Sequence, residues 1–219
     1  MSHPILFRDV YTVSGSHLDV LVHQGKIVEI SPHGESTHSS TALSGVEVIE
    51  GEGGLLSPPF VDAHFHLDAT LSLGRPRLNR SGTLFEGIQI WAEQKPMLTE
   101  EDVYQRAKEL LHWAIARGTL AMRTHVDTGD RELRAARALI RLRAEVAPYF
   151  DLQIVAFPQD GYLRHPRGVE LLTEALDLGV DVVGGIPHFE RTTAAGRESV
   201  ALLCRLAADR GLRVDMHCD

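Results

Sequence analysis

The feature that most constrains the fold is an alternation of apolar strands with amphipathic helices over residues 56–219. Strands are expected at 59–66, 120–126, 152–157, 182–186 and 212–217, with helices at 99–118, 131–147, 169–178 and 194–210 between them. Strands separated by helices of this length imply right-handed crossovers and a parallel sheet. The pattern therefore predicts an α/β fold with five parallel strands.

An open doubly wound sheet and a (β/α)8 barrel both accept this order of elements. The first usually has a GxGxxG phosphate turn after its first strand, where this chain has Ala63-His64-Phe65-His66. Polar residues follow every strand, which is where barrels build active sites. They are His64, His66, Thr124, His125, Asp127, Gln159, Asp160, His188, Glu190, His217 and Asp219. We therefore expect about the first five strands of a TIM-type (β/α)8 barrel. Since such a barrel needs eight strands and about 250 residues, we expect these 219 residues to be the N-terminal part of a longer protein.

Residues 1–55 read as a separate region of short β-rich runs, at 5–7, 18–22, 25–30 and 46–49. These runs predict an antiparallel sheet. About fifty residues are few for an independent sheet, so we expect it to be part of a composite β-sandwich. This division gives two domains, 1–55 and 56–219. His33 and His38 lie in the polar loop 31–44 and are interpreted as solvated rather than as metal ligands.

The charge and cysteine content exclude several classes of protein. A net charge of -8 argues against a nucleic-acid surface, which needs clustered lysine and arginine. Cys204 and Cys218 are the only cysteines, which argues against a disulfide framework and fits a reducing compartment. The chain has neither a leader pattern nor an apolar run near 18 residues. We expect a cytoplasmic homo-oligomer that acts on a small molecule and binds neither membrane nor nucleic acid.

His64 and His66 are the strongest candidates for chemistry. Side chains at i and i+2 of a strand share a face, with Cα atoms about 7 Å apart. Two imidazoles at that spacing can converge on one ion at about 2.1 Å. Two polar residues that merely end a strand are the plain alternative.

Six motifs in sequence resemble the cytosine deaminase branch of the amidohydrolase superfamily. They occupy residues 60–68, 81–87, 123–127, 151–159, 185–190 and 217–219. The resemblance implies one divalent metal, iron or zinc, held by His64, His66, His217 and a later aspartate. It also places the glutamate that shuttles protons directly after Asp219. The general acid/base is therefore expected outside the chain.

The resemblance also implies a substrate and the residues that bind it. Gln159 resembles the residue that hydrogen-bonds the amide edge of a pyrimidine, and an amide offers both a donor and an acceptor for that edge. Leu84 belongs to the loop 81–87 that covers the base, and Phe157 shares the motif of Gln159. The implied reaction is hydrolytic deamination of cytosine or a related amino-substituted heterocycle, in which a metal-activated hydroxide displaces ammonia.

Other histidines and acids near the motifs have open roles. Asp68, His125 and His188 are candidates that orient ligand histidines, or they are satisfied core and surface residues. Asp127 and Glu190 are interpreted as ion-pair partners or helix N-terminal acids. The two tryptophans, Trp91 and Trp113, are assigned to the core.

Three rival functions follow from the same residues. The nucleobase deaminases with an H-x-E…P-C-x-x-C signature are excluded, because the chain has no P-C-x-x-C. An amidohydrolase with one or two metals, cleaving a cyclic amide or a triazine C–N bond, is an alternative. Many binuclear members bridge their metals with a lysine after the fourth strand, and residues 182–190 contain none. A non-catalytic binding protein with the same barrel is the third possibility.

Overall fold

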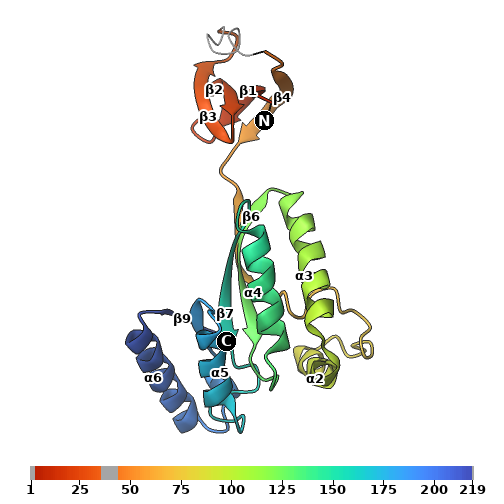
Figure 1. Cartoon of the computed structure of the whole chain (residues 1–219), viewed down its shortest axis with the longest axis vertical. Helices are drawn as coiled ribbons and strands as arrows, with labels where there is room; N and C mark the ends of the chain where they lie inside the picture. Colours follow the sequence, from red (N-terminus) through yellow and green to blue (C-terminus); the bar gives the residue numbers. More distant parts are fainter. Residues whose placement is uncertain (1–2, 36–43, 219) are drawn as a thin grey trace. The chain divides into compact units, whose positions relative to one another are not determined.

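The structure is a computed structural model and describes residues 3–35 and 44–218. It divides into two compact units, residues 1–58 and 59–219, close to the expected boundary at 55/56 (Figure 1). Whether unit 1 completes a β-sandwich stays a prediction.

Unit 1 is a four-stranded sheet with the order β3-β2-β1-β4. Its strands are β1 (Ile5–Thr12), β2 (His17–His23), β3 (Lys26–Pro32) and β4 (Glu47–Leu56). The pairs β1–β2 and β2–β3 are antiparallel as expected, but β1–β4 is parallel, so the sheet is mixed. A parallel neighbour needs a longer connection than a hairpin. The chain between β1 and β4 contains β2, β3 and the stretch 31–44 where the sequence predicts a loop, of which residues 36–43 lie outside the described residues.

β4 is longer than the expected run at 46–49, because it continues through three glycines. A Cβ on Gly51 would lie 2.7 Å from the carbonyl oxygen of Asp9, so only glycine fits there. Asp9 itself has a φ of 56° and lies where the register of β1 shifts against both neighbours. The bulge at Asp9 and the glycines of β4 therefore belong to one local arrangement.

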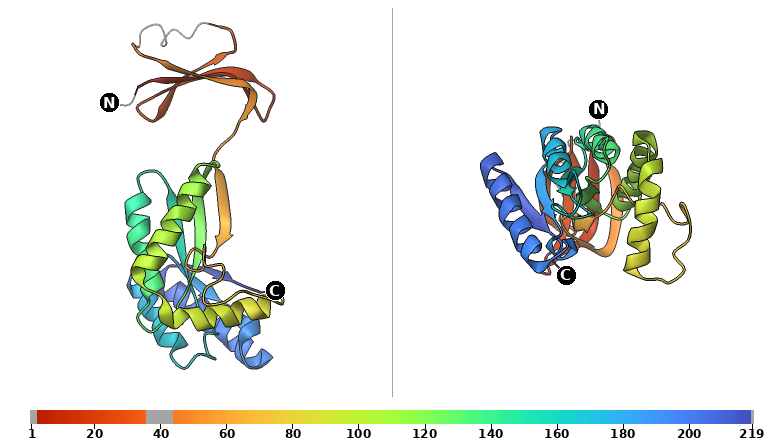
Figure 2. Two further views of the ribbon diagram at one scale, coloured as in Figure 1. Left: turned by 90° about the vertical axis from the view of Figure 1, so that its right-hand side faces the viewer. Right: turned by 90° about the horizontal axis from the view of Figure 1, so that it is seen from below.

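Unit 2 is a five-stranded parallel sheet with the order β5-β6-β7-β8-β9. In chain order its elements are β5 (Phe60–Phe65), α2 (Leu84–Gln94), the 3-10 helix η1 (Lys95–Met97), α3 (Glu100–Ile115), β6 (Thr119–Asp127), α4 (Arg134–Val146), β7 (Asp151–Phe157), α5 (Gly168–Asp177), β8 (Val182–Gly185), η2 (Pro187–Phe189), α6 (Thr193–Arg210) and β9 (Arg213–Met216). The helices α3 to α6 follow one another around the outer side of the sheet (Figure 2). The predicted partial (β/α)8 barrel is confirmed.

Four helices, α2, α3, α4 and α6, begin where a polar side chain accepts a hydrogen bond from an N–H group of the first turn, whereas α5 has no such side-chain cap. Thr99 caps α3 as the sequence predicts, with its hydroxyl accepting from the backbone N–H of Asp102. α4 begins at Arg134, later than the expected 131, because Asp130 accepts from the N–H groups of Glu132 and Arg134 and holds a turn there. Between helices and sheet lies an apolar core that includes Leu111, Leu139, Ile154, Leu171 and Leu203.

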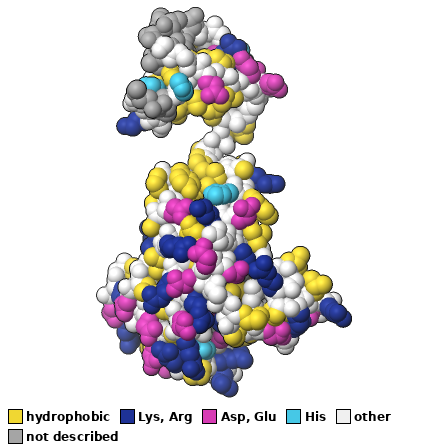
Figure 3. Space-filling view, turned by 45° about the vertical axis from the view of Figure 1, so that its right-hand side comes forward, with side chains coloured by type: hydrophobic (Ala, Val, Ile, Leu, Met, Phe, Trp, Pro, Cys, Tyr) yellow, Lys and Arg dark blue, Asp and Glu magenta, His cyan; other side chains and the backbone are white. Residues whose placement is uncertain are grey.

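The surface of unit 2 carries both signs of charge. On the face drawn in Figure 3, arginine and lysine side chains alternate with aspartate and glutamate. Within the described residues, no helix has the length and apolar character needed to cross a bilayer.

Candidate metal centre

Three histidines from the two edge strands of the parallel sheet meet at the carboxyl ends of its strands. His64 lies in β5, His66 directly follows that strand, and His217 follows β9. Neighbouring strands lie about 4.8 Å apart, so the first and fifth strands of a flat sheet would be about 19 Å apart. The Nε2 atoms of His66 and His217 are instead 3.3 Å apart. The curvature of the partial barrel therefore creates the site.

The three rings, here called the barrel cluster, have the geometry of a ligand set. Ring centroids are 4.7 Å apart for His64 and His217, and 5.4 Å for each of the other two pairs. One nitrogen of each ring lies within 4.8 Å of the others. A tetrahedral ion bound at about 2.1 Å separates two ligand atoms by about 3.4 Å, close to the measured Nε2 distance. The predicted triad is thus brought together in a form that fits one metal ion.

Burial keeps His66 in the protonation state that a ligand needs. It lowers the pKa of His66 to about 3, helped by the nearby imidazoles of His125, His217 and His64. His66 is therefore neutral at pH 7, with a free ring lone pair.

His125 packs behind the ligand rings. It is fully buried, and its ring centroid lies 4.3 Å from that of His64. Its Nδ1 is 3.4 Å from the carbonyl oxygen of Phe65, and its Nε2 is 3.3 Å from Oδ1 of Asp215. Burial lowers the pKa of His125 as well. Both nitrogens of His125 therefore face groups other than the cluster centre, which fits a supporting position.

Asp215 extends this support across the curved sheet. It lies on β9 and pairs with Arg123 of β6, with Nη1 and Oδ2 2.6 Å apart. Burial raises the pKa of Asp215, but hydrogen bonds from Arg123 and His125 outweigh it, and the net shift is downward. The ion pair of Arg123 and Asp215 thus lies next to the histidines on the inner face of the sheet.

Phe157, predicted to contact the substrate, is buried against the histidines. Its ring stacks on His217 at 4.2 Å and meets His66 edge-on at 5.5 Å. It does not line the cavity described below. What the structure shows is support of the ligand rings, and direct contact with a substrate stays a prediction.

Asp68 ties the end of β5 to β6. Its Oδ2 accepts from the backbone N–H of Asp127 at 2.8 Å, and the side chain of Arg106 donates to its carbonyl oxygen at 3.0 Å. Its Oδ1 is buried and has no hydrogen-bond partner among the described residues. Burial raises the pKa of Asp68 to about 7. The structure thus places Asp68 two residues from His66, with one oxygen left for a ligand or a proton.

A cavity of about 200 Å³ adjoins the barrel cluster. It is lined by His66, Asp68, Ala69, Leu84, Gly87, Ile88, Trp91, Asp127 and Gln159. Two residues that the resemblance assigns to substrate binding, Leu84 and Gln159, therefore share one space with a predicted ligand. A larger hollow of about 690 Å³ surrounds Tyr149 and Asp151 at the amino end of β7, and no histidine lines it.

Trp91 is a cavity residue that the sequence assigns only to the core. Leu84, Ile88 and Trp91 are spaced i, i+4 and i+7, so they share one face of α2. That spacing is the sequence signal that could have identified these three residues as one wall of the cavity. The other tryptophan, Trp113, is 48% exposed on α3, so its assignment to the core was wrong.

A buried ion-pair network holds Trp91 in place. Its Nε1 donates to Oδ2 of Asp127 at 2.7 Å, and Lys95 Nζ lies 2.8 Å from the same oxygen. Lys95 also donates to Asp160, which follows Gln159, at 2.5 Å. Burial lowers the pKa of Lys95, but the two carboxylates outweigh it and the net shift is upward. One cation therefore links the wall of α2 to the segment after β7.

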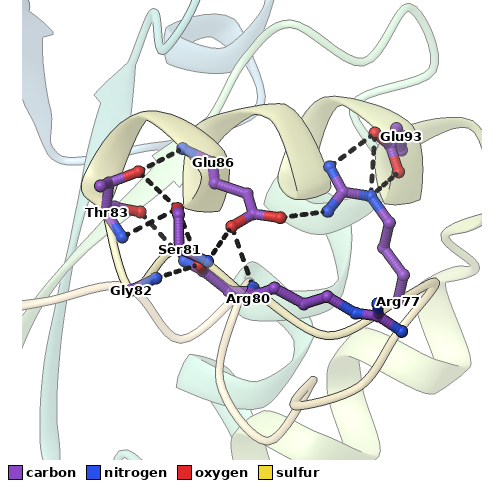
Figure 4. A network of polar contacts seen from close by, with 8 residues as sticks. Arg77, Arg80, Ser81, Gly82, Thr83, Glu86 and Glu93 are labelled. Carbon is purple, nitrogen blue, oxygen red and sulfur yellow. Dashed lines mark hydrogen bonds and ion pairs between the residues drawn. The ribbon is translucent and has the colours of Figure 1, made fainter.

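The predicted covering loop, residues 81–87, is organised by Glu86 (Figure 4). Its carboxylate accepts from the backbone N–H groups of Arg80 and Ser81 at 2.9 and 2.6 Å, and from Arg77 at 2.6 Å. Hydrogen bonds from Ser81, followed by Arg77, lower the pKa of Glu86 to about 2. Thr83 caps α2 in the same loop. The loop is thus fixed by its own polar contacts directly before Leu84.

The remaining candidates lie elsewhere. His188 is exposed on η2 and lines a separate cavity with Glu190 and Gly196. Glu190 accepts from the backbone N–H groups of Leu163 and Arg164, as an ion-pair or capping acid would. His38 and Asp219 lie outside the described residues.

Comparison with known proteins decides the family. A model of the Amidohydrolase family matches residues 47–219, which is most of the chain. The chain belongs to the Amidohydrolase family. The predicted resemblance is confirmed, and the histidine cluster fits the divalent metal expected of an amidohydrolase.

The chain is similar to amidohydrolases of several activities. It is 43% identical to 5-methylcytosine deaminase from Klebsiella pneumoniae liganded with 5-fluorocytosine, with a TM-score of 0.87, over 99% of this chain and 51% of that one. It is 28% identical to N-isopropylammelide isopropylaminohydrolase from Burkholderia multivorans, with a TM-score of 0.77, over 99% and 53%. The N-isopropylammelide isopropyl amidohydrolase of Pseudomonas sp. (strain ADP) is also 28% identical, over 97% of this chain and 52% of its own length. The chain thus spans about half the length of these relatives.

Proposed function

We propose that the chain is part of a hydrolase that removes the amino group from cytosine or a closely related amino-substituted pyrimidine. The observation that carries this proposal is the cavity that His66, Leu84 and Gln159 share. Its size, about 200 Å³, lies below the roughly 300–1,000 Å³ of sites for drug-sized ligands. A single heterocyclic ring suits such a space. The likeness to a deaminase liganded with 5-fluorocytosine supports the same class of substrate.

In this proposal His64, His66 and His217 hold one iron or zinc ion, which would supply an activated water near neutral pH. The residues of this chain prepare that site. Burial keeps His66 neutral. His125 and Phe157 pack against the rings and restrict their rotation. Restricting the ligands in this way lowers the entropic cost of binding an ion.

Gln159 orients the substrate in this proposal. Its side-chain amide offers one donor group and one acceptor, which match the O=C–NH edge of cytosine. Leu84, Ile88 and Trp91 form the apolar wall against which a flat ring can lie. A site that hydrogen-bonds a polar edge discriminates strongly, because a mismatched substrate leaves buried groups unpaired. The general acid/base is expected beyond Asp219, so the proposal concerns a longer protein.

Hydrolysis of a triazine C–N bond, or of a cyclic amide, is the second candidate. The 28% identity to the two N-isopropylammelide hydrolases favours it. The same amide edge occurs in those rings, so Gln159 alone does not separate the candidates. Assembly as a homo-oligomer stays a prediction.

Replacing Gln159 by alanine in the longer protein tests the substrate assignment. We expect kcat/KM for cytosine to fall by roughly 2–4 kcal/mol in transition-state terms, with the metal content unchanged. Gln105→Ala is the matched control, because Gln105 lies on α3 and contacts Glu101 on the same helix. The assay uses a panel of cytosine, 5-substituted cytosines, aminotriazines and cyclic amides. Unchanged cytosine turnover in Gln159→Ala, or a wild type that prefers a cyclic amide, contradicts the proposal.

Metal analysis tests the barrel cluster separately. We expect one tightly bound iron or zinc ion per chain, lost in each of His64→Ala, His66→Ala and His217→Ala. Removing a supporting residue around a metal typically costs 10- to 100-fold in affinity, and removing a ligand should cost more. His112→Ala, at an exposed site on α3, is the control. Two ions retained at the cluster, or full occupancy after loss of two ligands, contradicts a mononuclear site.

A further inference from the structure

A second group of histidines lies in unit 1, across neighbouring strands. Tyr11 of β1 pairs with His17 of β2, and the backbone N–H of His33 donates to the carbonyl oxygen of His17 at 3.0 Å. The three rings therefore form a row. Ring centroids are 4.2 Å apart both for Tyr11 and His17 and for His17 and His33. Strand register thus holds two imidazoles side by side.

Two carboxylates join this row. Asp9, in the bulge of β1, has its Oδ1 2.6 Å from Nε2 of His17. Asp19 is buried two residues after His17 on β2, and its Oδ1 lies 2.8 Å from Nδ1 of His33 and accepts from the backbone N–H of Asp9 at 2.9 Å. Asp19 is thus committed to anchoring its neighbours. A histidine whose ring N–H donates to a buried carboxylate is oriented as metal-binding histidines usually are.

We propose that Asp9, His17 and His33 form a second metal site, selective for a divalent transition ion such as Zn²⁺, in place of the sequence-based interpretation of His33 as a solvated residue. Each residue offers one ligand atom, and these atoms lie within 4.8 Å of one another. Two imidazoles and one carboxylate suit Zn²⁺, Co²⁺ and Fe²⁺, and a water would complete the coordination. Asp19 supports the site through His33. We call the three proposed ligands the sheet cluster.

The surroundings allow an ion to enter. The side chains of His17, Asp9 and His33 are 35%, 33% and 35% exposed. An ion bound there would take the place of the hydrogen bond between His17 and Asp9. The rings of His17 and His33 are inclined by 27°, so they rotate before both lone pairs point to one position. That rotation makes the site weaker than the barrel cluster.

The ligands of this site come from three segments of unit 1. Asp9 lies on β1, His17 begins β2, and His33 directly follows β3. A bound ion would therefore cross-link three strands of a small sheet. An ion that binds the folded state alone raises its apparent stability by mass action. The role assigned to this site is to stabilise unit 1, independently of the reaction at the barrel.

Cobalt titration of the full chain tests this site. In a His66→Asn/His217→Asn background, which removes the barrel cluster, we expect one equivalent of Co²⁺, visible by its ligand-field absorption and displaced by Zn²⁺. Adding His17→Asn or His33→Asn should abolish it. His23→Asn, at the other end of β2, is the matched control and should retain it. Circular dichroism of each metal-free variant checks folding. If the background variant does not fold, the wild type should bind two equivalents, reduced to one by His17→Asn.

Two results would overturn the site. One is the absence of bound Co²⁺ at millimolar concentration in a folded background variant, which would leave only hydrogen-bonded ion pairs. The other is one full equivalent retained after His17→Asn/His33→Asn. Neither result bears on the proposed metal site at the barrel cluster, because that site is tested by separate variants.

Discussion

The barrel cluster and the sheet cluster use the same side chain in two different settings. In the barrel cluster, residues more than 150 positions apart meet because a parallel sheet curves. In the sheet cluster, residues on neighbouring strands meet because of local register. The first has aromatic rings and buried charges behind it. The second has carboxylates as direct partners and remains about one-third exposed.

This difference predicts which contacts contribute most to the free energy of unfolding. Close to the barrel cluster, ionised groups are buried, so breaking one pair leaves an uncompensated charge and is costly. In the sheet cluster the pairs are exposed, and such pairs contribute little. Substitutions of similar chemistry should therefore have large effects beside the barrel cluster and small ones in the sheet. The next three predictions test that contrast.

Lys95→Met should have the largest effect on stability. The side chains of Lys95 and Asp127 are 11% and 4% exposed, and two carboxylates depend on this one cation. Its loss leaves Asp127 buried without a counter-ion, so we expect the free energy of unfolding to fall by about 3 kcal/mol. Urea unfolding at neutral pH measures this. Trp91 fluorescence should also change, because Trp91 donates to the same carboxylate.

Two controls separate charge from packing in that experiment. Lys108→Met removes a lysine whose partner Glu145 is 40% exposed, and should change stability by less than about 1 kcal/mol. Adding Asp127→Asn to Lys95→Met removes the stranded charge and should recover part of the loss. Equal effects of Lys95→Met and Lys108→Met would mean that burial does not distinguish the two settings.

Asp68→Asn should have the next largest effect, in the opposite direction. The pKa of Asp68 is about 7 in the folded chain, against an ordinary value of 3.8. Between these values the unfolded state releases its proton while the folded state keeps it, so stability falls as pH rises from 4 to 7. Asparagine removes that cost. We expect the metal-free variant to be more stable than wild type by about 2 kcal/mol at pH 8, and nearly equal at pH 4.

Urea unfolding in the presence of a chelator at several pH values checks this. Asp102→Asn is a useful contrast, because Arg106 and Arg75 lower the pKa of Asp102 and outweigh its burial. Its loss should destabilise at pH 8. If Asp68→Asn destabilises the chain at pH 8, the unpaired oxygen of Asp68 has a stabilising partner in solution.

The sequence predicts what depends on periodicity and on strand ends. Strand and helix order and the parallel sheet follow from those signals, whereas the selection of His64, His66 and His217 as one set follows from the family resemblance. It does not predict that β1 and β4 are parallel, since strand direction across a long loop leaves no local pattern. It also leaves out Lys95, because a buried lysine is recognised only once its two carboxylates are in place. His188 follows a strand like the others, yet the 3-10 helix η2 carries it to an exposed position.

His17→Asn in the metal-free chain should have the smallest effect. His17 and Asp9 are each about one-third exposed, and the pair is ionic only when His17 is protonated. The interaction is a single, partly exposed hydrogen bond beside a stacked Tyr11, so its loss should cost less than about 1 kcal/mol. Asp19→Asn provides the contrast, because Asp19 is 4% exposed and three groups depend on its oxygens. We expect about 2 kcal/mol there. Urea unfolding with a chelator present measures both losses of stability. If His17→Asn lost as much as Asp19→Asn, the exposure of a residue would not predict its contribution to stability, and the contrast between the two histidine clusters would fail.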